Sequence, residues 1–577
     1  MPLICRQIAA LFLTLAITAP VLADAAGRWA GTCFFPGWPQ VYGVFSADAS
    51  GGQLSIFAAN LKDQPVSSWE HAGDRVAFDV DIHGSRFTLQ GQSQTAEGDR
   101  SLAGSIVAAD SDVPGRFSWK FMPVVAGMAD AQRWSGTLDI QGIQQLEMVL
   151  DTARDSKGRL HVDLSIPAQH VMQYPLEIAM EDGPKAQALL HTGSLATMNM
   201  EFGSEQIAVG FQQGAFQQEI VFTLNADAAI ALNRPQEPTP PFPYEEREVE
   251  IVHPDGHTLA GTITVPAGEG PHPAVVLISG SGPQDRNEEI MGHKPFLVLA
   301  DHLTREGVAV LRADDRGVGG SIVADRDSLR LATSKDFASD INALFEHLAS
   351  QPDIDAARIG LIGHSEGGCI GPLVADQRDD VAFLILMAGT GRPGLEVLKD
   401  QNRRIMEVEG ADAKTIEDTL DQYERVMKMV LADVPREQLR EPMRTLSRMQ
   451  LEAGGLSMPV TDELVEQAIV ESKSPWLHFF MIHDPGTVLE RIDVPIFAMN
   501  GTLDVQVISE YELPAIEHAV RRGGGTVLIR EYQGLNHLFQ PAQTGSVAEY
   551  DKIETTIDPQ VLEDISAWIG EQVSPND

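Results

Sequence analysis

Three residues in the C-terminal half of the chain could together activate a nucleophile: Ser365, Asp504 and His537. Ser365 is at the centre of a Gly-x-Ser-x-Gly sequence at 363–367. A serine hydroxyl attacks a carbonyl only when a histidine takes its proton, and an aspartate must hold that histidine in the right tautomer. The three residues therefore predict attack by Ser365 on a carboxylic ester or amide, provided that the fold brings them together.

Ser365 could also be an ordinary helix N-cap, which accepts a hydrogen bond from a free backbone N–H and does no chemistry. The surrounding sequence favours the nucleophile. The apolar run "RIGLIG" (358–363) predicts a strand before the serine, and "GGCIGPLVADQ" (367–377) predicts a helix after it. A serine at such a strand-to-helix turn projects from the end of a sheet, and the flanking glycines relieve the crowding there.

Asp504 and His537 each follow a predicted strand. Asp504 lies in the loop after "VPIFAMNG" (494–501), and His537 lies in the loop after "TVLIREY" (526–532). The order serine, aspartate, histidine, with each residue in a loop after a strand, is the order that this kind of active site requires. The other candidates lie before a strand, in a predicted helix or in a long helical segment: Asp484, Asp493, His478, His483 and His518.

An oxyanion formed at the attacked carbonyl needs preorganised N–H donors. We expect one from the backbone of Glu366, directly after Ser365, and one from the backbone of Ser281 in "SGSGPQDRN" (279–287). Glycines on both sides of Ser281 let this backbone approach a ligand closely, although an ordinary glycine turn has the same composition. A phosphate-binding loop is disfavoured, because the segment lacks both the Lys-Ser/Thr ending of a P-loop and the third glycine of a dinucleotide fingerprint.

Short apolar runs alternate with helix-length segments after residue 245. The runs predict strands at 274–280, 308–314, 358–363, 382–389, 494–501 and 526–532. Apolar strands separated by helices are typical of a doubly wound α/β fold around a mostly parallel sheet. Between about 390 and 490 the sequence is amphipathic and helical, without a comparable strand. We expect a helical insertion there that packs over the strand ends as a cap.

The N-terminal part has a different pattern and an internal repeat. "RWAGT" begins at Arg28 and "RWSGT" at Arg133, and each is followed by alternating apolar and polar residues broken by turn residues. Alternation with period two, interrupted every ~8–12 residues, is typical of all-β sandwiches and barrels. The predicted organisation is an all-β domain at 24–126, a second all-β domain at 127–231, a proline-rich linker at 232–244 and an α/β domain at 245–577.

The first 23 residues resemble a secretory signal peptide. Arg6 gives a weakly basic start, residues 8–19 are apolar, and Val21 and Ala23 are small or β-branched residues before the expected cleavage point. The apolar stretch is too short for a comfortable membrane span. We expect export to a periplasm or to the extracellular space, without stable membrane insertion once the segment is removed.

Composition limits the partners and cofactors. The formal net charge of −40 repels phosphate backbones and anionic membranes, so no nucleic-acid partner is expected. The chain has three cysteines, Cys5, Cys33 and Cys369, which form no disulfide framework. A bridge between the last two stays open, but two separate buried thiols are favoured. No zinc-binding or calcium-loop motif occurs, so we expect no metal or other cofactor.

The segments "SGSGPQDRN", "RADDRGVGGS", "GHSEGG", "NGTLDVQV" and "LNHLFQ" together resemble bacterial carboxylesterases of the α/β-hydrolase superfamily. The resemblance covers about 245–577, cap included, and implies ester hydrolysis with Ser365, Asp504 and His537 as the triad. In one departure, Ser279 stands before Gly280 where related sequences commonly have histidine. The N-terminal repeat resembles modules sometimes joined to such hydrolases and implies no activity.

The leading hypothesis is an exported serine esterase that acts on a small-molecule ester. A serine peptidase acting on short peptides or aminoacyl amides is an alternative, because it would use the same triad and differ only in its pocket. A second alternative is an envelope glycan-binding protein with a decayed hydrolase domain, against which the complete triad argues. The acyl length, the alcohol, the role of the β-domains and the oligomeric state are left open by the sequence.

Overall fold

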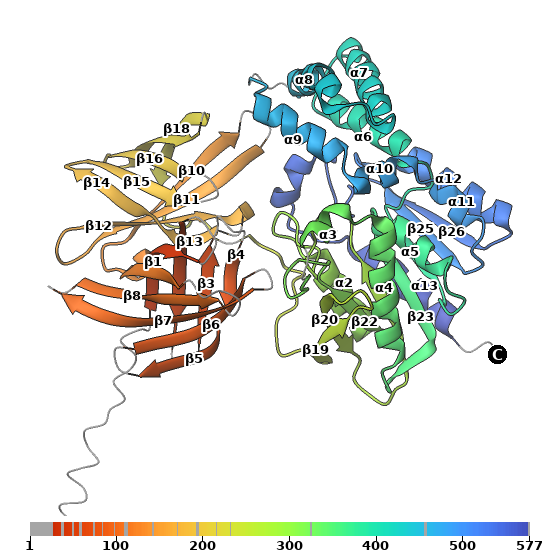
Figure 1. The fold of residues 1–577 in the computed structure, drawn as a ribbon, viewed down its shortest axis with the longest axis horizontal. Helices are drawn as coiled ribbons and strands as arrows, with labels where there is room; N and C mark the ends of the chain where they lie inside the picture. The colour runs from red at the N-terminus through yellow and green to blue at the C-terminus, as the bar shows by residue number, and fades with distance from the viewer. Residues whose placement is uncertain are drawn as a thin grey trace, which may run out of the picture. The chain divides into compact units, whose positions relative to one another are not determined.

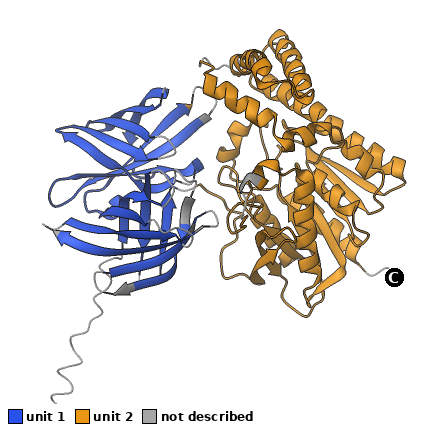
Figure 2. Cartoon of the chain, viewed as in Figure 1, with its two compact units in different colours: residues 1–139, 145–231 blue, residues 140–144, 232–577 orange. Residues whose placement is uncertain are grey.

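A computed structural model describes residues 27–574. Its gaps are at 36–39, 49–50, 57–60, 73–74, 83–84, 97–98, 109–113, 141–143, 170, 192–194, 215, 231, 324–325 and 455–458. The predicted signal segment, 1–23, lies outside the described residues. The chain divides into two compact units, one of residues 1–139 and 145–231 and the other of residues 140–144 and 232–577 (Figure 2).

The first unit contains two antiparallel sheets with the same strand order (Figure 1). The first has the order β4-β3-β2-β1-β9-β8-β7-β6-β5, and the second has the order β13-β12-β11-β10-β18-β17-β16-β15-β14. The first sheet consists of β1 (Gly27–Phe34), β2 (Val41–Ala47), β3 (Gly52–Ile56), β4 (Leu61–Pro65), β5 (Ser67–Ala72), β6 (Arg75–Ile82), β7 (Ser85–Ala96), β8 (Asp99–Ala108) and β9 (Gly115–Phe121). The second consists of β10 (Gln132–Ile140), β11 (Gln144–Arg154), β12 (Leu160–Ile166), β13 (Val171–Pro175), β14 (Glu177–Asp182), β15 (Lys185–His191), β16 (Leu195–Phe202), β17 (Gln206–Gln213) and β18 (Phe216–Leu224).

Each of these sheets is barrel-like because its two edge strands are halves of one bent strand. Only Val66 separates β4 from β5, and only Leu176 separates β13 from β14. The first strand of each sheet also pairs with the last. A barrel of about eight strands has an interior that side chains can fill. Large buried aromatic residues fill the first one, among them Trp29, Phe45 and Trp119.

The two copies of the repeat occupy equivalent positions in the two sheets. Trp29 lies in β1 and Trp134 lies in β10, and both are buried. The arginine before each tryptophan has a different partner. Arg28 forms an ion pair of 2.7 Å with the buried Asp163 of the second sheet, whereas Arg133 pairs within its own sheet. Arg28 therefore joins the two barrel-like sheets of this unit.

The second unit is built around an eight-stranded sheet of order β19-β20-β22-β21-β23-β24-β25-β26. Its strands are β19 (Glu245–Val252), β20 (Thr258–Val265), β21 (His272–Ile278), β22 (Ala309–Ala313), β23 (Ile354–His364), β24 (Leu384–Met387), β25 (Ile496–Gly501) and β26 (Val527–Tyr532). β20 runs antiparallel to both its neighbours, and the remaining pairs are parallel. The six predicted strands are all present, from β21 to β26, and β19 and β20 extend the sheet beyond them.

Helices pack against both faces of this sheet. One face contacts α4 (Ser334–Ala349), α5 (Gly367–Ala375), α11 (Pro485–Leu489) and α12 (Ser509–Gly523); the other contacts α2 (Pro295–Arg305) and α13 (Pro559–Val573). Alternate residues of β21 show this division, because Val276 belongs to the first apolar core and Val275 to the second. Both faces of the central strands are therefore apolar, and functional side chains must lie at the strand ends.

A helical segment is inserted between β24 and β25 (Figure 1). Its helices are α6 (Gly394–Val408), α7 (Ala413–Leu431), α8 (Arg436–Ala453), α9 (Asp462–Ser472) and α10 (Pro475–Ile482). The segment has an apolar core of its own, which includes Tyr423, Leu439, Met443 and Ile469. None of the helices within the described part of the chain is long and apolar enough to span a membrane.

The proline-rich segment 232–244 contains no helix or strand, but it is anchored to the α/β unit. Arg234 donates to the carbonyl oxygens of Gly292 at 3.0 Å and Ile553 at 2.9 Å, and Gln236 donates to that of Ile557 at 2.7 Å. The first part of the linker is therefore bound to the α/β unit and is not a free spacer.

The two cysteines among the described residues are separate buried thiols, as expected. The Sγ atom of Cys33 accepts a hydrogen bond from the Trp119 indole at 3.2 Å, and Cys369 lies 2.7 Å from the Thr390 hydroxyl. Burial raises the pKa of both thiols to about 12. Neither thiol has the exposed, low-pKa character of a reactive cysteine.

Candidate active site

Ser365 lies at the sharp turn between β23 and α5. Its φ of 54° is in the left-handed region, which a residue other than glycine adopts only when the surrounding structure holds it there. The glycines around it leave no room for a side chain. A Cβ atom on Gly363 would lie 2.1 Å from the carbonyl oxygen of Gly367, and one on Gly367 would lie 2.2 Å from that of Ile278. This turn has the geometry of a nucleophile elbow.

Asp504 and His537 are hydrogen-bonded to each other at the ends of neighbouring strands. Nδ1 of His537 lies 2.8 Å from Oδ2 of Asp504, and the two residues are 4% and 2% exposed. The other carboxylate oxygen of Asp504 accepts the backbone N–H groups of Gln506 at 2.8 Å and Val507 at 2.9 Å. The aspartate is therefore fixed in orientation, and it holds the proton of a neutral His537 on Nδ1.

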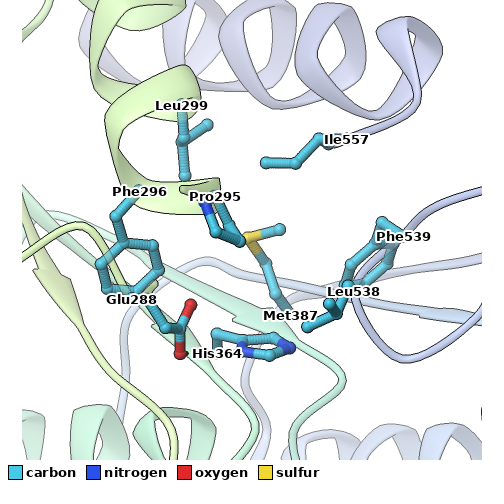
Figure 3. Close-up of a pocket in the computed structure, with 9 residues that line it drawn as sticks. All are labelled: Glu288, Pro295, Phe296, Leu299, His364, Met387, Leu538, Phe539 and Ile557. Atoms are coloured by element: carbon cyan, nitrogen blue, oxygen red, sulfur yellow. Dashed lines mark hydrogen bonds and ion pairs between the residues drawn. The ribbon is translucent and has the colours of Figure 1, made fainter. Parts of the chain in front are cut away.

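His364, the residue before Ser365, links the turn to the loop of His537. Nε2 of His364 lies 3.0 Å from the carbonyl oxygen of His537, and Nδ1 lies 2.9 Å from Oε1 of the buried Glu288 (Figure 3). Burial lowers the pKa of His364, but the Glu288 carboxylate and the carbonyl of His537 outweigh burial and raise it above the ordinary histidine value. A charged His364 donates to both partners, which holds the His537 loop beside Ser365.

A small cavity lies next to this pair, between His364, Glu288, helix α2 and the His537 loop (Figure 3). Its volume of about 10 Å³ is close to what one water molecule needs. Apart from the pair, its lining is apolar, with Phe296, Leu299 and Phe539 among the side chains. This cavity is too small to hold a substrate.

Two adjacent aspartates hold the loop after β21, residues 279–287. Asp315 accepts a hydrogen bond from the Ser279 hydroxyl at 2.8 Å and from the Gln284 backbone N–H at 2.9 Å. Asp314 accepts from the backbone N–H of Arg286 at 2.9 Å and from its guanidinium at 3.0 Å. Ser279 is thus a hydrogen-bond donor to Asp315.

The candidate oxyanion donor Ser281 lies between the two contacts of Asp315 and is exposed. The neighbouring Gly280 approaches the nucleophile turn closely, since a Cβ atom on it would lie 3.3 Å from the Cβ of Ser365. The backbone N–H of Gly280 is already bonded to Glu288 at 2.7 Å. Of these two adjacent N–H groups, that of Ser281 is therefore the better candidate to face a substrate.

Asp315 should make the stability of the protein depend on pH. Burial raises its pKa from 3.8 to about 7, against the opposing hydrogen bonds from Gln284 and Ser279. The unfolded state loses this proton at lower pH, because its Asp315 has an ordinary pKa. Tighter proton binding in the folded state therefore adds to the free energy of unfolding. This contribution is complete below about pH 4 and is lost as pH rises through about 7. The full shift corresponds to at most about 4 kcal/mol, and to less in practice because Asp315 is partly exposed.

We expect Asp315→Asn to be neutral at every pH and to keep both hydrogen bonds, because an amide oxygen can accept from Gln284 while its NH₂ donates to Ser279. Urea unfolding at pH 4.5, 6 and 8 measures this effect. The stability of the variant relative to wild type should increase from pH 4.5 to pH 8. An identical pH dependence in the two proteins would show that Asp315 has an ordinary pKa.

One group of described residues away from this site has the composition of a metal site: His253, His257 and Asp340, whose ligand atoms all lie within 4.8 Å. Arg316 already donates to both Asp340 oxygens, at 2.7 and 2.8 Å. The two imidazole rings are stacked, with 4.2 Å between centroids and 20° between planes. Nε2 of His257 lies 2.7 Å from Asp340, and Nε2 of His253 lies 3.0 Å from the Ser339 hydroxyl, so the group is better explained as a hydrogen-bonded structural cluster.

The structure thus places Ser365, Asp504, His537, Glu366 and Ser281 at the carboxyl ends of β23, β25, β26 and β21. The contacts of His364, Glu288 and Asp315 that hold the loops of the site were not predicted from the sequence. Asp315 lies in "DDRGVGG" (314–320), which the sequence indicates only as a turn beside the site. His364 and Glu288 carry no local signal, because their pairing depends on how distant loops pack.

Two sequence comparisons bear on the class of protein. A family model described as Serine aminopeptidase, S33 matches residues 293–439, which include Ser365 but neither Asp504 nor His537. Esterase EstD from Thermotoga maritima is 26% identical over 332 residues, which make up 57% of this chain and 68% of that protein. The esterase match covers more than half of this chain and points to the same class of enzyme as the site.

Solved structures of hydrolases are also similar to the chain. An esterase of Pyrococcus furiosus, Pf2001, is 14% identical, covers 60% of this chain and 100% of its own, and has a TM-score of 0.35. A dienelactone hydrolase of Anabaena variabilis is 14% identical, covers 57% of this chain and 97% of its own, and has a TM-score of 0.32. Because these TM-scores are low, only the sequence matches bear on the class of enzyme. By sequence, the C-terminal region of the chain is similar to a serine aminopeptidase family and to an esterase, and these matches support a hydrolase of the esterase type.

Proposed function

We propose that the protein hydrolyses carboxylic esters through a triad of Ser365, His537 and Asp504. The observation that carries this proposal is the 2.8 Å hydrogen bond between His537 and the buried Asp504, in a loop that His364 ties to the strained turn at Ser365. The likeness to an esterase of Thermotoga maritima supports an ester as the substrate.

In the first half of the reaction, Nε2 of His537 takes the proton of Ser365 as Oγ bonds to the ester carbonyl carbon. Backbone N–H groups of Glu366 and Ser281 stabilise the oxyanion. The tetrahedral intermediate then expels the alcohol, which leaves with the proton from His537. In the second half, water attacks the acyl-enzyme, His537 takes its proton and returns it to Ser365, and the carboxylic acid is released. Asp504 stabilises the imidazolium in both halves.

We also propose that the α/β sheet is doubly wound and that α6–α10 form a cap over its strand ends. Support for the cap comes from Trp476 in α10, whose indole donates to the Glu366 carboxylate at 2.8 Å, so this helix reaches the residue next to Ser365. Trp476 stacks on Phe480, with 5.8 Å between ring centroids. These half-buried rings are candidates for the wall of an apolar acyl or alcohol pocket.

Export is part of the proposal and rests on residues 1–23, which have the pattern of a signal peptide. The mature enzyme would act in a periplasm or outside the cell on a small-molecule ester. The net charge of −40 disfavours nucleic acid and anionic membranes as partners. Appearance of the mature protein in a periplasmic or culture-supernatant fraction, without residues 1–23, would support export.

Hydrolysis of p-nitrophenyl esters from acetate to laurate tests the proposed activity, with an aminoacyl p-nitroanilide in parallel. We expect ester hydrolysis by the mature chain, with a chain-length optimum that reports the size of the pocket. The match to the serine aminopeptidase family makes amide hydrolysis the second candidate function. Preferential cleavage of the anilide would overturn the esterase proposal in favour of a peptidase with the same triad.

A further inference from the structure

The Glu366 side chain is buried in the active-site region, although only its backbone N–H is needed for an oxyanion hole. The residue is 3% exposed. Oε1 accepts hydrogen bonds from the Ser334 hydroxyl at 2.6 Å and from the Trp476 indole at 2.8 Å. The Ser281 hydroxyl also bonds to this carboxylate. Burial raises the pKa of Glu366, and these three hydrogen bonds act against that rise.

The three donors come from three separate parts of the chain. Ser281 belongs to the loop after β21, Ser334 is the first residue of α4, and Trp476 belongs to α10 of the inserted helical segment. A buried carboxylate is costly unless donors satisfy it, so each donor constrains where the others can lie. The Glu366 carboxylate therefore connects the helical segment to the loop that carries the candidate oxyanion donor.

Trp476 itself is held firmly in place. Its ring is stacked on Phe480 with an interplanar angle of 12°. Phe480 packs directly on the start of α6, since a Cβ atom on Gly394 would lie 2.6 Å from the Phe480 ring. α10 is thus fixed against α6, and the direction of the Trp476 indole N–H follows from the packing of the helical segment.

Ser281 differs from its neighbours in the carboxylate that its side chain contacts. Ser279 and Gln284 are held by Asp315, and Gly280 is held by Glu288. Ser281 is exposed and is followed by Gly282, whose φ of 96° is a conformation that favours glycine. The hydrogen bond from its hydroxyl ties Ser281 to Glu366, and its carbonyl oxygen accepts from the Gln284 side chain at 3.1 Å.

We propose that the Glu366 carboxylate is a positioning group that couples helix α10 to the oxyanion hole. Its hydrogen bond from Trp476 makes its position depend on where the helical segment lies, and its hydrogen bond from Ser281 orients the second oxyanion donor. The inference rests on the esterase mechanism proposed above, because it assigns Ser281 the same role. The helical segment is then part of the catalytic geometry and not only a cover over the site.

The test begins with steady-state kinetics on p-nitrophenyl acetate, a substrate too small to need a large pocket. Trp476→Phe keeps the stacked ring and removes only the N–H donor, and we expect it to lower kcat by about 10-fold with KM unchanged within about twofold. Glu366→Ala should lower kcat by about 100-fold, since losing an oxyanion donor outright costs about 10²–10³. Glu366→Gln can accept from Trp476 and donate to Ser281, so it should recover most of that loss.

A matched control and a double variant separate positioning from folding. Trp568→Phe makes the same replacement in α13, on the other face of the sheet, and should leave kcat unchanged. Ser281→Ala keeps the backbone donor but loses the hydroxyl. Combined with Trp476→Phe, its loss in kcat should not multiply, because both changes act through one carboxylate. Equal kinetics for the two tryptophan variants, or fully multiplicative losses, would overturn the proposal.

The indole N–H resonances of the seven tryptophans provide a readout that does not depend on activity. The resonance missing from Trp476→Phe identifies Trp476. We expect it to move in Glu366→Ala and in Ser281→Ala, and to stay in place in Trp568→Phe. A Trp476 resonance unmoved by Glu366→Ala would overturn the coupling. Failure of the esterase proposal would be recognised separately, as wild-type protein without Ser365-dependent hydrolysis, and the resonances would still decide whether the three residues are coupled.

Discussion

Replacing Ser365 with alanine is expected to lower kcat for ester hydrolysis by a factor of about 10³–10⁶, with little change in KM. The variant loses the oxygen proposed to form the acyl-enzyme, whereas the proposed oxyanion donors remain. The substitution leaves the backbone strain at this turn unchanged, because a φ of 54° is as unfavourable for alanine as for serine. The fold should therefore be retained, and any residual rate should reflect transition-state binding alone.

Two measurements decide whether this loss is chemical. Ser350→Ala, in the turn after α4, removes a hydroxyl that bonds only to the His347 carbonyl among its described contacts, and it should keep wild-type kinetics. A fluorophosphonate probe should label wild type on the peptide that contains Ser365 and should leave Ser365→Ala unlabelled. Label on another serine, together with full activity of the alanine variant, would rule out Ser365 as the nucleophile.

Asp504→Asn is expected to lower kcat by a factor of about 10³–10⁴ although the replacement is nearly isosteric. Oδ1 of Asp504 accepts two backbone N–H groups, from Gln506 and Val507, so an asparagine must keep its carbonyl oxygen there. Its NH₂ group then faces Nδ1 of His537 and donates to it. That tautomer carries its proton on Nε2, and His537 can no longer accept the proton of Ser365.

The matched control for this change is Asp376→Asn, which breaks a surface ion pair with Arg491. Surface ion pairs contribute about 0–1 kcal/mol, so this variant should match wild type in both kcat and KM. Asp504→Asn should resemble wild type in KM and in its circular dichroism and differ only in kcat. If the two asparagine variants had similar kinetics, another residue would have to orient His537.

The secondary structure of the α/β unit was largely predictable because its signals are local. The apolar runs around Val275, Leu361 and Phe497 are strands buried on both faces, and such runs stand out in a sequence. β19 and β20, which form the antiparallel side of the sheet, were not predicted, although β20 is buried like the central strands. β19 carries charged side chains such as Glu246 and Glu248 on its exposed positions, so it lacks the apolar run that marks the central strands.

The N-terminal repeat was predictable as two all-β domains, but its closure was not. Alternation of apolar and polar residues specifies strands and their buried faces, which the structure confirms for residues such as Phe78 and Leu89. Whether such strands form a sandwich or a barrel depends on which edges pair. The bends at Val66 and Leu176, which let one strand serve both edges of its sheet, have no local signature.

By itself the sequence determined the candidate nucleophile, acid and base, because Ser365, Asp504 and His537 each follow a recognisable strand and a parallel sheet brings the ends of its strands to one edge. Only the tertiary structure decided what surrounds them. The bonds of His364 to Glu288 and of Glu366 to Trp476 join residues 76 and 110 positions apart. Such contacts depend on how loops and helices pack over the sheet, and no periodicity or motif in the chain encodes that packing locally.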